Sequence, residues 1–167
     1  MSIPQEVIAN KIFLIRGQRV MLDRYLAGLY GVPTKVLNQA VKRNVKRFPD
    51  DFMFQLTKEE FKHWRSQFVT SNSDRMGLRR APYAFTEQGI AMLSSVLNSE
   101  RAIMANIQIM RTFVKIKEMI MTHKDLQRKI EGMEKKYDGQ FRVVFEAIKQ
   151  LIKEEQKPKK TIGFHNK

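Results

Sequence analysis

Two short apolar runs near the start of the chain predict a β-hairpin. Residues 12–15 and 20–22 are apolar, and each run is long enough for a short strand. The polar connection between them contains Gly17, which can adopt the backbone angles of a tight turn.

Two short helices are predicted directly after the hairpin. Asp23 can cap a helix over residues 24–30, and Gly31 is expected to end it. Pro33 suits the first turn of a second helix, over residues 33–44. Two helices joined by so short a turn are typical of a helix-turn-helix.

A strand and a further helix are predicted in the middle of the chain. Residues 52–56 show the alternation of a strand, and Thr57 with Glu60 forms a capping box that opens a helix over residues 59–68. The apolar pattern then disappears over residues 69–82, where small, polar and basic residues accumulate. We expect a loop there.

The following part of the chain is predicted to be mostly helical. After an aromatic segment at residues 83–85, Thr86 opens a helix that runs through Leu97, and Gly89 allows close packing within it. Between residues 100 and 122 apolar side chains recur at helical spacing. This pattern predicts a long amphipathic helix.

The pattern changes after residue 122. From Leu126 to Leu151 the apolar residues keep heptad spacing, apart from one stutter beside Gly139, which predicts a coiled-coil-like helix. This helix either joins two copies of the chain as a homodimer or folds back on its own domain. No packing pattern follows it, so a flexible basic tail is expected.

These elements predict an α+β fold that is mostly helical. It comprises a helix-turn-helix, a small β-hairpin or wing-like element and a long C-terminal helical, coiled-coil-like extension. The length of 167 residues suits one core of ordinary size. We expect a domain at residues 1–122, a helical extension at 123–154 and the tail at 155–167.

The charge of the chain limits the class of partner. There are 31 Lys and Arg against 17 Asp and Glu, a net charge of +14, which attracts nucleic acid, an anionic membrane or an acidic protein. No apolar stretch is long enough to span a membrane and no secretion signal is recognisable, so a cytoplasmic protein is expected. The absence of cysteine excludes disulfides, thiolate metal sites and cysteine catalysis.

The helix predicted at residues 33–44 concentrates the positive charge. Residues 33–47 contain five basic side chains and no acidic one. On a helical wheel Leu37 and Val41 fall on one side. The opposite side carries Lys35, Asn38, Gln39, Lys42 and, if the helix continues, Lys46. The amides of Asn38 and Gln39 can pair with adenine in the major groove, whereas the narrow apolar stripe does not suit a membrane surface.

Double-stranded DNA is therefore the expected partner of this helix. The candidate contacts in and just after it are Thr34, Lys35, Asn38, Gln39, Lys42, Arg43, Lys46 and Arg47. Arg75, Arg79 and Arg80 in the predicted loop either reach the DNA or only improve solubility. Arg16 and Arg19 beside the hairpin turn either contact the DNA backbone as a wing or are there because turns favour charged residues. An ordinary solvated face is the alternative for the helix itself, but such a face mixes Glu with Lys.

Two sequence blocks resemble a known family. They are LYGVPTKVLNQAVKRNVKRFPDDFMFQLT and APYAFTEQGIAMLSSVLNSERAIMANIQIMRTF. In this order they are similar to the phage ORF-six N-terminal domain subgroup of the KilA-N superfamily. The resemblance implies a DNA-binding module of phage and prophage regulators, which in some proteins precedes an antirepressor-type domain. Only the heptad segment and the tail follow here, so that second activity is not expected.

We therefore expect a phage- or prophage-derived transcription regulator that binds specific DNA sequences. No catalysis, cofactor, metal ion or small-molecule substrate is expected. A helix start explains the segment FTEQG at residues 85–89 better than catalysis does. His63, His123 and His165 lack the spacing of a metal site. The alternative is an antirepressor-like protein-interaction module whose basic face docks an acidic partner.

Overall fold

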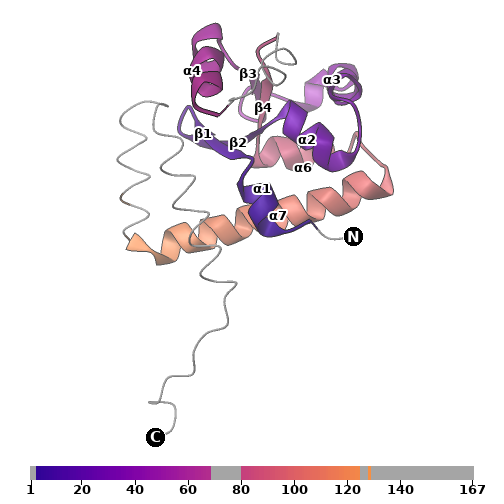
Figure 1. Ribbon diagram of the computed structural model, residues 1–167. Coiled ribbons are helices and arrows are strands. Elements are labelled where there is room, and N and C mark those ends of the chain that lie inside the picture. Colours follow the sequence, from indigo (N-terminus) through magenta and orange to yellow (C-terminus); the bar gives the residue numbers. More distant parts are fainter. Residues whose placement is uncertain (1–2, 69–79, 125–127, 129–167) are drawn as a thin grey trace, which may run out of the picture.

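The computed structural model describes residues 3–68, 80–124 and 128, and these residues form an α+β fold (Figure 1). Within them six α-helices accompany a four-stranded antiparallel sheet. The first elements are α1 (Gln5–Ala9), β1 (Ile12–Ile15), β2 (Gln18–Leu22), α2 (Asp23–Tyr30), α3 (Thr34–Arg43) and the 3-10 turn η1 (Val45–Arg47). The later ones are β3 (Met53–Gln55), α4 (Lys58–Phe68), β4 (Tyr83–Thr86), α6 (Glu87–Leu93) and α7 (Glu100–Thr122).

The predicted β-hairpin is confirmed and forms one side of the sheet. β1 and β2 pair antiparallel, with Phe13 opposite Val20. Arg16 and Gly17 form the turn with φ angles of 55° and 71°, the left-handed conformation that a type I′ hairpin turn requires at both central residues. The strand order is β1-β2-β4-β3, so the short strand predicted at residues 52–56 lies at the far edge.

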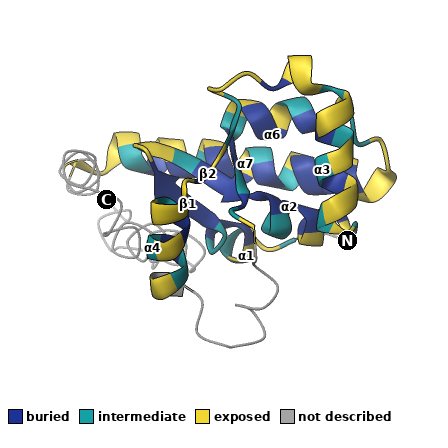
Figure 2. Ribbon diagram, turned by 90° about the horizontal axis from the view of Figure 1, so that it is seen from above, coloured by how far each residue is buried: buried dark blue, intermediate teal, exposed yellow. Residues whose placement is uncertain are grey.

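The helices lie in layers around this sheet. Figure 1 shows α7 along the bottom with α1 across it, α2 and α6 above α7, and α3 and α4 at the top. Strand β1, most of β2 and β4, and the inner sides of α2, α6 and α7 are buried (Figure 2). Tyr30 of α2 donates its hydroxyl to Asn106 Oδ1 of α7 inside this core. Burial raises the pKa of Tyr30, so the hydroxyl remains the donor.

Two predicted helices are confirmed, one of them with its predicted capping box. Thr57 N donates to Glu60 Oε1 at 2.8 Å, and Glu60 N donates to Thr57 Oγ1 at 3.1 Å, so the capping box opens α4. The long amphipathic helix is α7, with the expected bounds of residues 100 and 122.

Trp64 of α4 is buried in the core, edge-on to Phe13 with ring centroids 5.7 Å apart.

The predicted role of Asp23 as a helix cap is wrong. Asp23 is the first residue of α2, Leu22 precedes the helix, and no side-chain hydrogen bond caps it. The carboxylate is buried; one oxygen accepts from the adjacent Arg24 N, and the other accepts from Asn38 and Tyr83 on other elements. Since it accepts hydrogen bonds from distant residues, a local reading of the sequence could not assign it.

The helix opened by Thr86 is shorter than predicted. It ends at Leu93 rather than at Leu97. Ser94 and Ser95 follow it and donate their hydroxyls to backbone carbonyls three residues earlier, at 2.6 and 2.7 Å. Such bonds compete with the helical ladder, so the chain leaves the helix here.

Most of the predicted loop and C-terminal extension lies outside the described residues. Residues 80–82 of the loop are described, and of the extension only residues 123, 124 and 128 are. Lys124 and Arg128 are helical. Among the described helices, none combines the length and the apolar character that a membrane span requires.

Candidate functional site

The outward side of α3 and the turn η1 form a basic surface. We call this the α3 surface; its exposed side chains are Lys35, Val36, Gln39, Lys42, Arg43, Val45, Lys46 and Arg47. No acidic residue occurs between residues 24 and 49. Within the described residues, none of the five basic side chains of this surface forms an ion pair.

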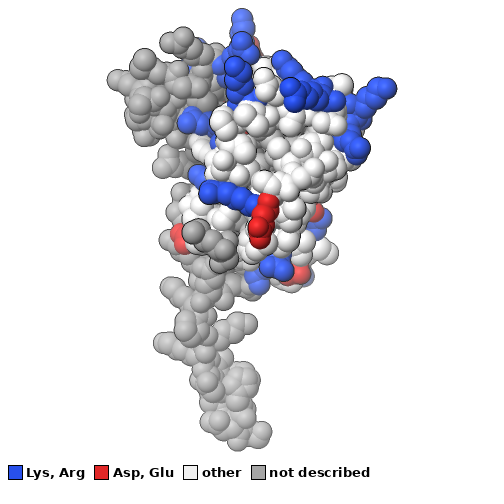
Figure 3. All heavy atoms as spheres, turned by 90° about the vertical axis from the view of Figure 1, so that its right-hand side faces the viewer, with Lys and Arg blue, Asp and Glu red and all other residues white. Residues whose placement is uncertain are grey.

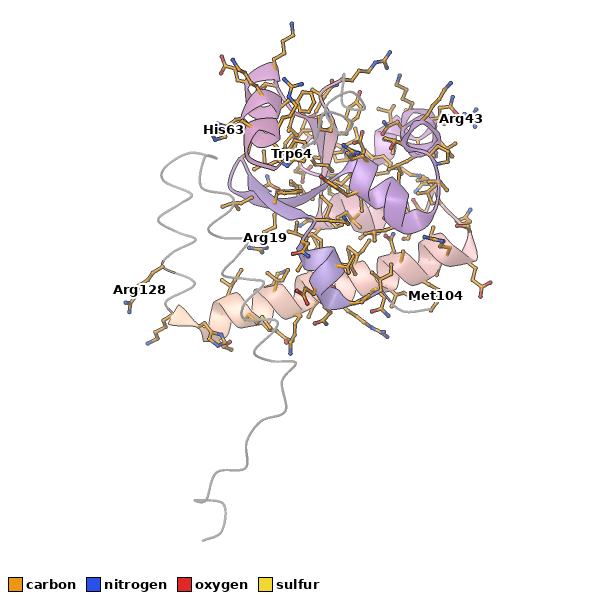
Figure 4. All side chains as sticks on the ribbon, viewed as in Figure 1. Arg19, Arg43, His63, Trp64, Met104 and Arg128 are labelled. Atoms are coloured by element: carbon orange, nitrogen blue, oxygen red, sulfur yellow. The ribbon has the colours of Figure 1, made fainter. Side chains whose placement is uncertain are left out.

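Figures 3 and 4 show how these cations are displayed. In Figure 3, Lys and Arg side chains spread over the upper part of the side that carries α3, and the clearly visible acidic groups lie lower, at the level of α7. Arg43 points away from the body of the molecule in Figure 4. The surface is therefore open to a large polyanion.

A tight turn and two buried side chains hold α3 in place. Leu37 and Val41 are buried, as the helical wheel predicts. Gly31 ends α2 in the left-handed conformation, with φ at 73°. The left-handed backbone favours glycine at this position, and a Cβ there would lie 2.7 Å from Arg101 Nε and would displace that flexible side chain.

A buried carboxylate connects α2, α3 and β4. Asp23 Oδ1 accepts from Arg24 N at 2.7 Å, and Asp23 Oδ2 accepts from Asn38 Nδ2 at 3.1 Å and from Tyr83 N at 3.3 Å. Burial raises the pKa of Asp23, and these three hydrogen bonds oppose that shift. Asp23 therefore fixes the position of α3 relative to the sheet.

The predicted position of Asn38 on the exposed face is wrong. Its side chain is half-buried, and its Nδ2 donates to Asp23 Oδ2. The wheel placed it beside Lys42, but it lies at the edge of the inner side of α3. The error has a physical cause, because the acceptor comes from fifteen residues earlier and a wheel contains no such information.

The other predicted contacts are placed as follows. Gln39 is exposed, like the five basic side chains of the α3 surface, and Thr34 is half-buried at the first position of α3. Arg80 is exposed just before β4. Arg75 and Arg79 lie outside the described residues. The structure thus brings the helical candidates together on one side, with Asn38 and Thr34 at its edge.

The sequence reading missed two valines in this surface. Val36 is 43% exposed and Val45 61% exposed. Both leave apolar methyl groups in solvent between basic side chains, where polar residues would be expected. The helical wheel already indicates that Val36 is exposed, since this residue falls outside the apolar stripe that contains Leu37 and Val41.

The hairpin turn is held against α4 by an ion pair. Arg16 Nε and Nη2 donate to the two carboxylate oxygens of Glu60 at 2.8 Å each, and the guanidinium lies 4.2 Å from the ring centroid of Phe54. The Arg16 guanidinium lowers the pKa of Glu60. These contacts engage Arg16 within the domain, and Arg19 is half-buried.

The FTEQG segment has a structural role in the described fold. Thr86 Oγ1 accepts from Gly89 N at 3.3 Å and caps α6, as predicted. A Cβ at Gly89 would lie 1.9 Å from the carbonyl oxygen of Phe52, so only glycine permits this contact. In the part of the chain that is described, no three His, Asp or Glu side chains are grouped to hold a metal ion.

Comparison with known proteins gives one family-level finding. The family model described as ORF6N domain matches residues 10–96. This range begins just before β1, ends just after α6 and includes the whole α3 surface. No curated protein and no solved structure matches the chain.

Proposed function

The chain belongs to the ORF6N domain family, and from this premise we propose that it is a DNA-binding transcription regulator of phage or prophage origin. The supporting observation is the α3 surface, which exposes five basic side chains and no acidic one. Double-stranded DNA is the polyanion whose charge density such a surface suits. The proposed activity is sequence-specific binding without a chemical reaction.

The proposal includes a helix-turn-helix made of α2 and α3, with α3 in the major groove. In this docking mode the second helix reads base edges with its exposed side. The short turn at Gly31 and the buried inner side of α3 are features that this mode needs. The β1–β2 hairpin would be the wing-like element, and membership of the KilA-N superfamily is part of the same proposal.

The side chains of the α3 surface divide into two proposed roles. Gln39 and Arg43 read bases, because an amide can form paired hydrogen bonds with adenine and a guanidinium with guanine. The lysines at 35, 42 and 46, with Arg47, contact phosphates and set the affinity. Arg80 is a further phosphate contact, reached from the segment before β4. Asn38 supports α3 through Asp23 rather than reading a base.

The decisive experiment is a titration of the full chain with labelled DNA at several salt concentrations. We expect binding to duplex DNA that weakens steeply with salt, and tighter binding to sequences selected from a random pool. Single-stranded DNA and RNA of the same length serve as competitors. Absent duplex binding, or duplex binding that ignores salt, would contradict the proposal.

A matched pair of variants locates the interface. Lys42→Ala removes a cation from the α3 surface, and Lys124→Ala removes one just beyond the C-terminal end of α7. Only the first is expected to weaken duplex binding. The rival function, docking of an acidic protein, predicts partners that survive nuclease treatment together with no affinity for DNA.

The oligomeric state of the C-terminal extension stays a prediction. The sequence predicts that the helical region 123–154 either joins two copies or folds back on its own domain, and only three of its residues are described. Light scattering of the full chain would measure the mass of the particle in solution.

A further inference from the structure

The helix α7 has two apolar sides. Its inner side is buried and includes Ile109, Phe113 and Ile116. Its outer side also carries apolar residues, which are exposed in the described part of the chain: Ile103, Met104, Ile107, Val114 and Met121. A soluble helix normally has polar residues on the side that faces water. The outer side of α7 is therefore a candidate interface.

Three of the exposed residues form a regular row. Ile107, Val114 and Met121 are seven residues apart, so they lie nearly in line along about 21 Å of helix. We call these three residues the α7 row. Arg111 and Glu118 lie beside it on the same edge, because each follows a row residue by four positions.

We propose that the α7 row packs against the α7 row of a second copy of the chain, with the two helices antiparallel and the twofold axis at Val114. In this register Val114 faces the partner's Val114. Because the row is symmetric about Val114, Ile107 faces the partner's Met121, and Met121 faces the partner's Ile107. All three positions of the row then bury apolar surface.

Charge complementarity supports a second copy in this orientation. Antiparallel helices place the same edge of each row side by side. Arg111 therefore lies next to the partner's Glu118, and Glu118 next to the partner's Arg111. In a parallel pair the two charged edges would lie on opposite sides of the seam, so neither Arg111 nor Glu118 would reach its partner. Within the described residues neither Arg111 nor Glu118 forms an ion pair with its own chain.

The proposed dimer leaves both α3 surfaces accessible. α7 runs along the bottom of the molecule in Figure 1, whereas α3 lies at the top with α2 and α6 between them. Pairing through the outer side of α7 thus places the two α3 surfaces at the two far sides of the dimer. Such a particle would join two separate duplexes or two distant segments of one duplex, rather than two adjacent half-sites.

Single introduced cysteines test the register directly, because the chain has none of its own. Val114→Cys places two thiols at the twofold axis, and mild oxidation of the full chain should convert most of it into a disulfide-linked dimer. Met104→Cys is the matched control, since Met104 is 43% exposed against 49% for Val114 but lies off the row. It should form little disulfide-linked dimer under the same oxidation. A mixture of Ile107→Cys and Met121→Cys chains should give the mixed dimer.

A charge exchange provides a second test that does not depend on cysteine. Arg111→Glu turns two attractive pairs into two repulsive ones and should raise the dimer dissociation constant about tenfold. Glu118→Arg should do the same. The double variant restores opposite charges with reversed polarity, so it should recover the original dissociation constant in analytical ultracentrifugation.

These outcomes separate the dimer from the proposed DNA binding, since neither readout involves DNA. Val114→Cys chains that oxidise no faster than Met104→Cys chains would overturn the proposal. So would a double charge variant that stays as weak as the single variants. A strictly monomeric full chain would also overturn it, and would indicate that another segment or another protein covers the row.

Discussion

At the scale of the residue, Asn38 and Gln39 show how neighbours in the sequence take different roles. Both are amides on α3, but Asn38 donates to the buried Asp23 carboxylate, whereas Gln39 is exposed among basic side chains. A residue that supports the helix and a residue that reads a base should respond differently to substitution.

We expect Asn38→Ala to destabilise the protein by about 1–2 kcal/mol, because a buried carboxylate loses a hydrogen-bond donor. DNA binding should then weaken to the same extent for all sequences. Gln39→Ala should leave the stability within about 0.5 kcal/mol and relax the preference at one base pair. Urea unfolding and binding to single-base variants of a selected site measure both effects. Unchanged stability in Asn38→Ala with lost preference at one base pair would identify Asn38 as a reading residue.

The ion pair between Arg16 and Glu60 predicts a pH dependence of stability. The pKa of Glu60 is lowered in the folded protein, so its charged form stabilises the fold above the ordinary pKa of a glutamate. This contribution is lost as the pH falls through the lowered pKa. Glu60→Gln keeps an oxygen for the capping box and removes the charge.

The measurement is the difference in unfolding free energy between the wild type and Glu60→Gln at successive pH values. We expect the wild type to be more stable at neutral pH, and the difference to disappear in the acidic range. Asp23 titrates in both proteins, so its raised pKa cancels from the difference. A difference that stayed constant down to low pH would show that the charge of Glu60 does not stabilise the hairpin turn.

At the scale of the element, two glycines predict opposite effects of the same substitution. Gly89→Ala in α6 would force a Cβ to within 1.9 Å of the Phe52 carbonyl oxygen, so β3 and α6 would have to separate. We expect Gly89→Ala to lower the free energy of unfolding by more than about 2 kcal/mol. Gly28→Ala in α2 meets no atom within 4 Å and should stabilise the helix by up to about 1 kcal/mol. Thermal unfolding of both variants tests these two predictions. Equal shifts in Tm would contradict the close packing at Gly89.

At the scale of the whole molecule, the number of phosphate contacts, rather than the net charge of +14, determines how strongly salt weakens DNA binding. Each phosphate contact contributes about one unit to the slope of log K against log salt. Lys42→Ala should therefore reduce that slope by about one unit and weaken binding to all sequences alike. Lys124→Ala changes the net charge equally but lies far from α3, so its slope should match the wild type. Equal slopes for all three proteins would exclude Lys42 from the interface.

The sequence by itself determined the elements and the character of the α3 surface. The hairpin, the capping box of α4 and the bounds of α7 follow from hydrophobic periodicity and from hydrogen bonds between residues a few positions apart. The exposed basic residues of α3 follow from the same periodicity. Such features depend on local geometry, which is determined by residues that are close together in the sequence.

Only the tertiary structure decided which polar groups meet. Asp23 accepts from residues fifteen and sixty positions away, and Arg16 binds Glu60 across forty-four positions. These contacts removed Asn38 from the exposed face and placed Arg16 against α4. They could not be read from the sequence, because the energy of a buried polar group depends on partners that the fold alone brings within hydrogen-bond distance.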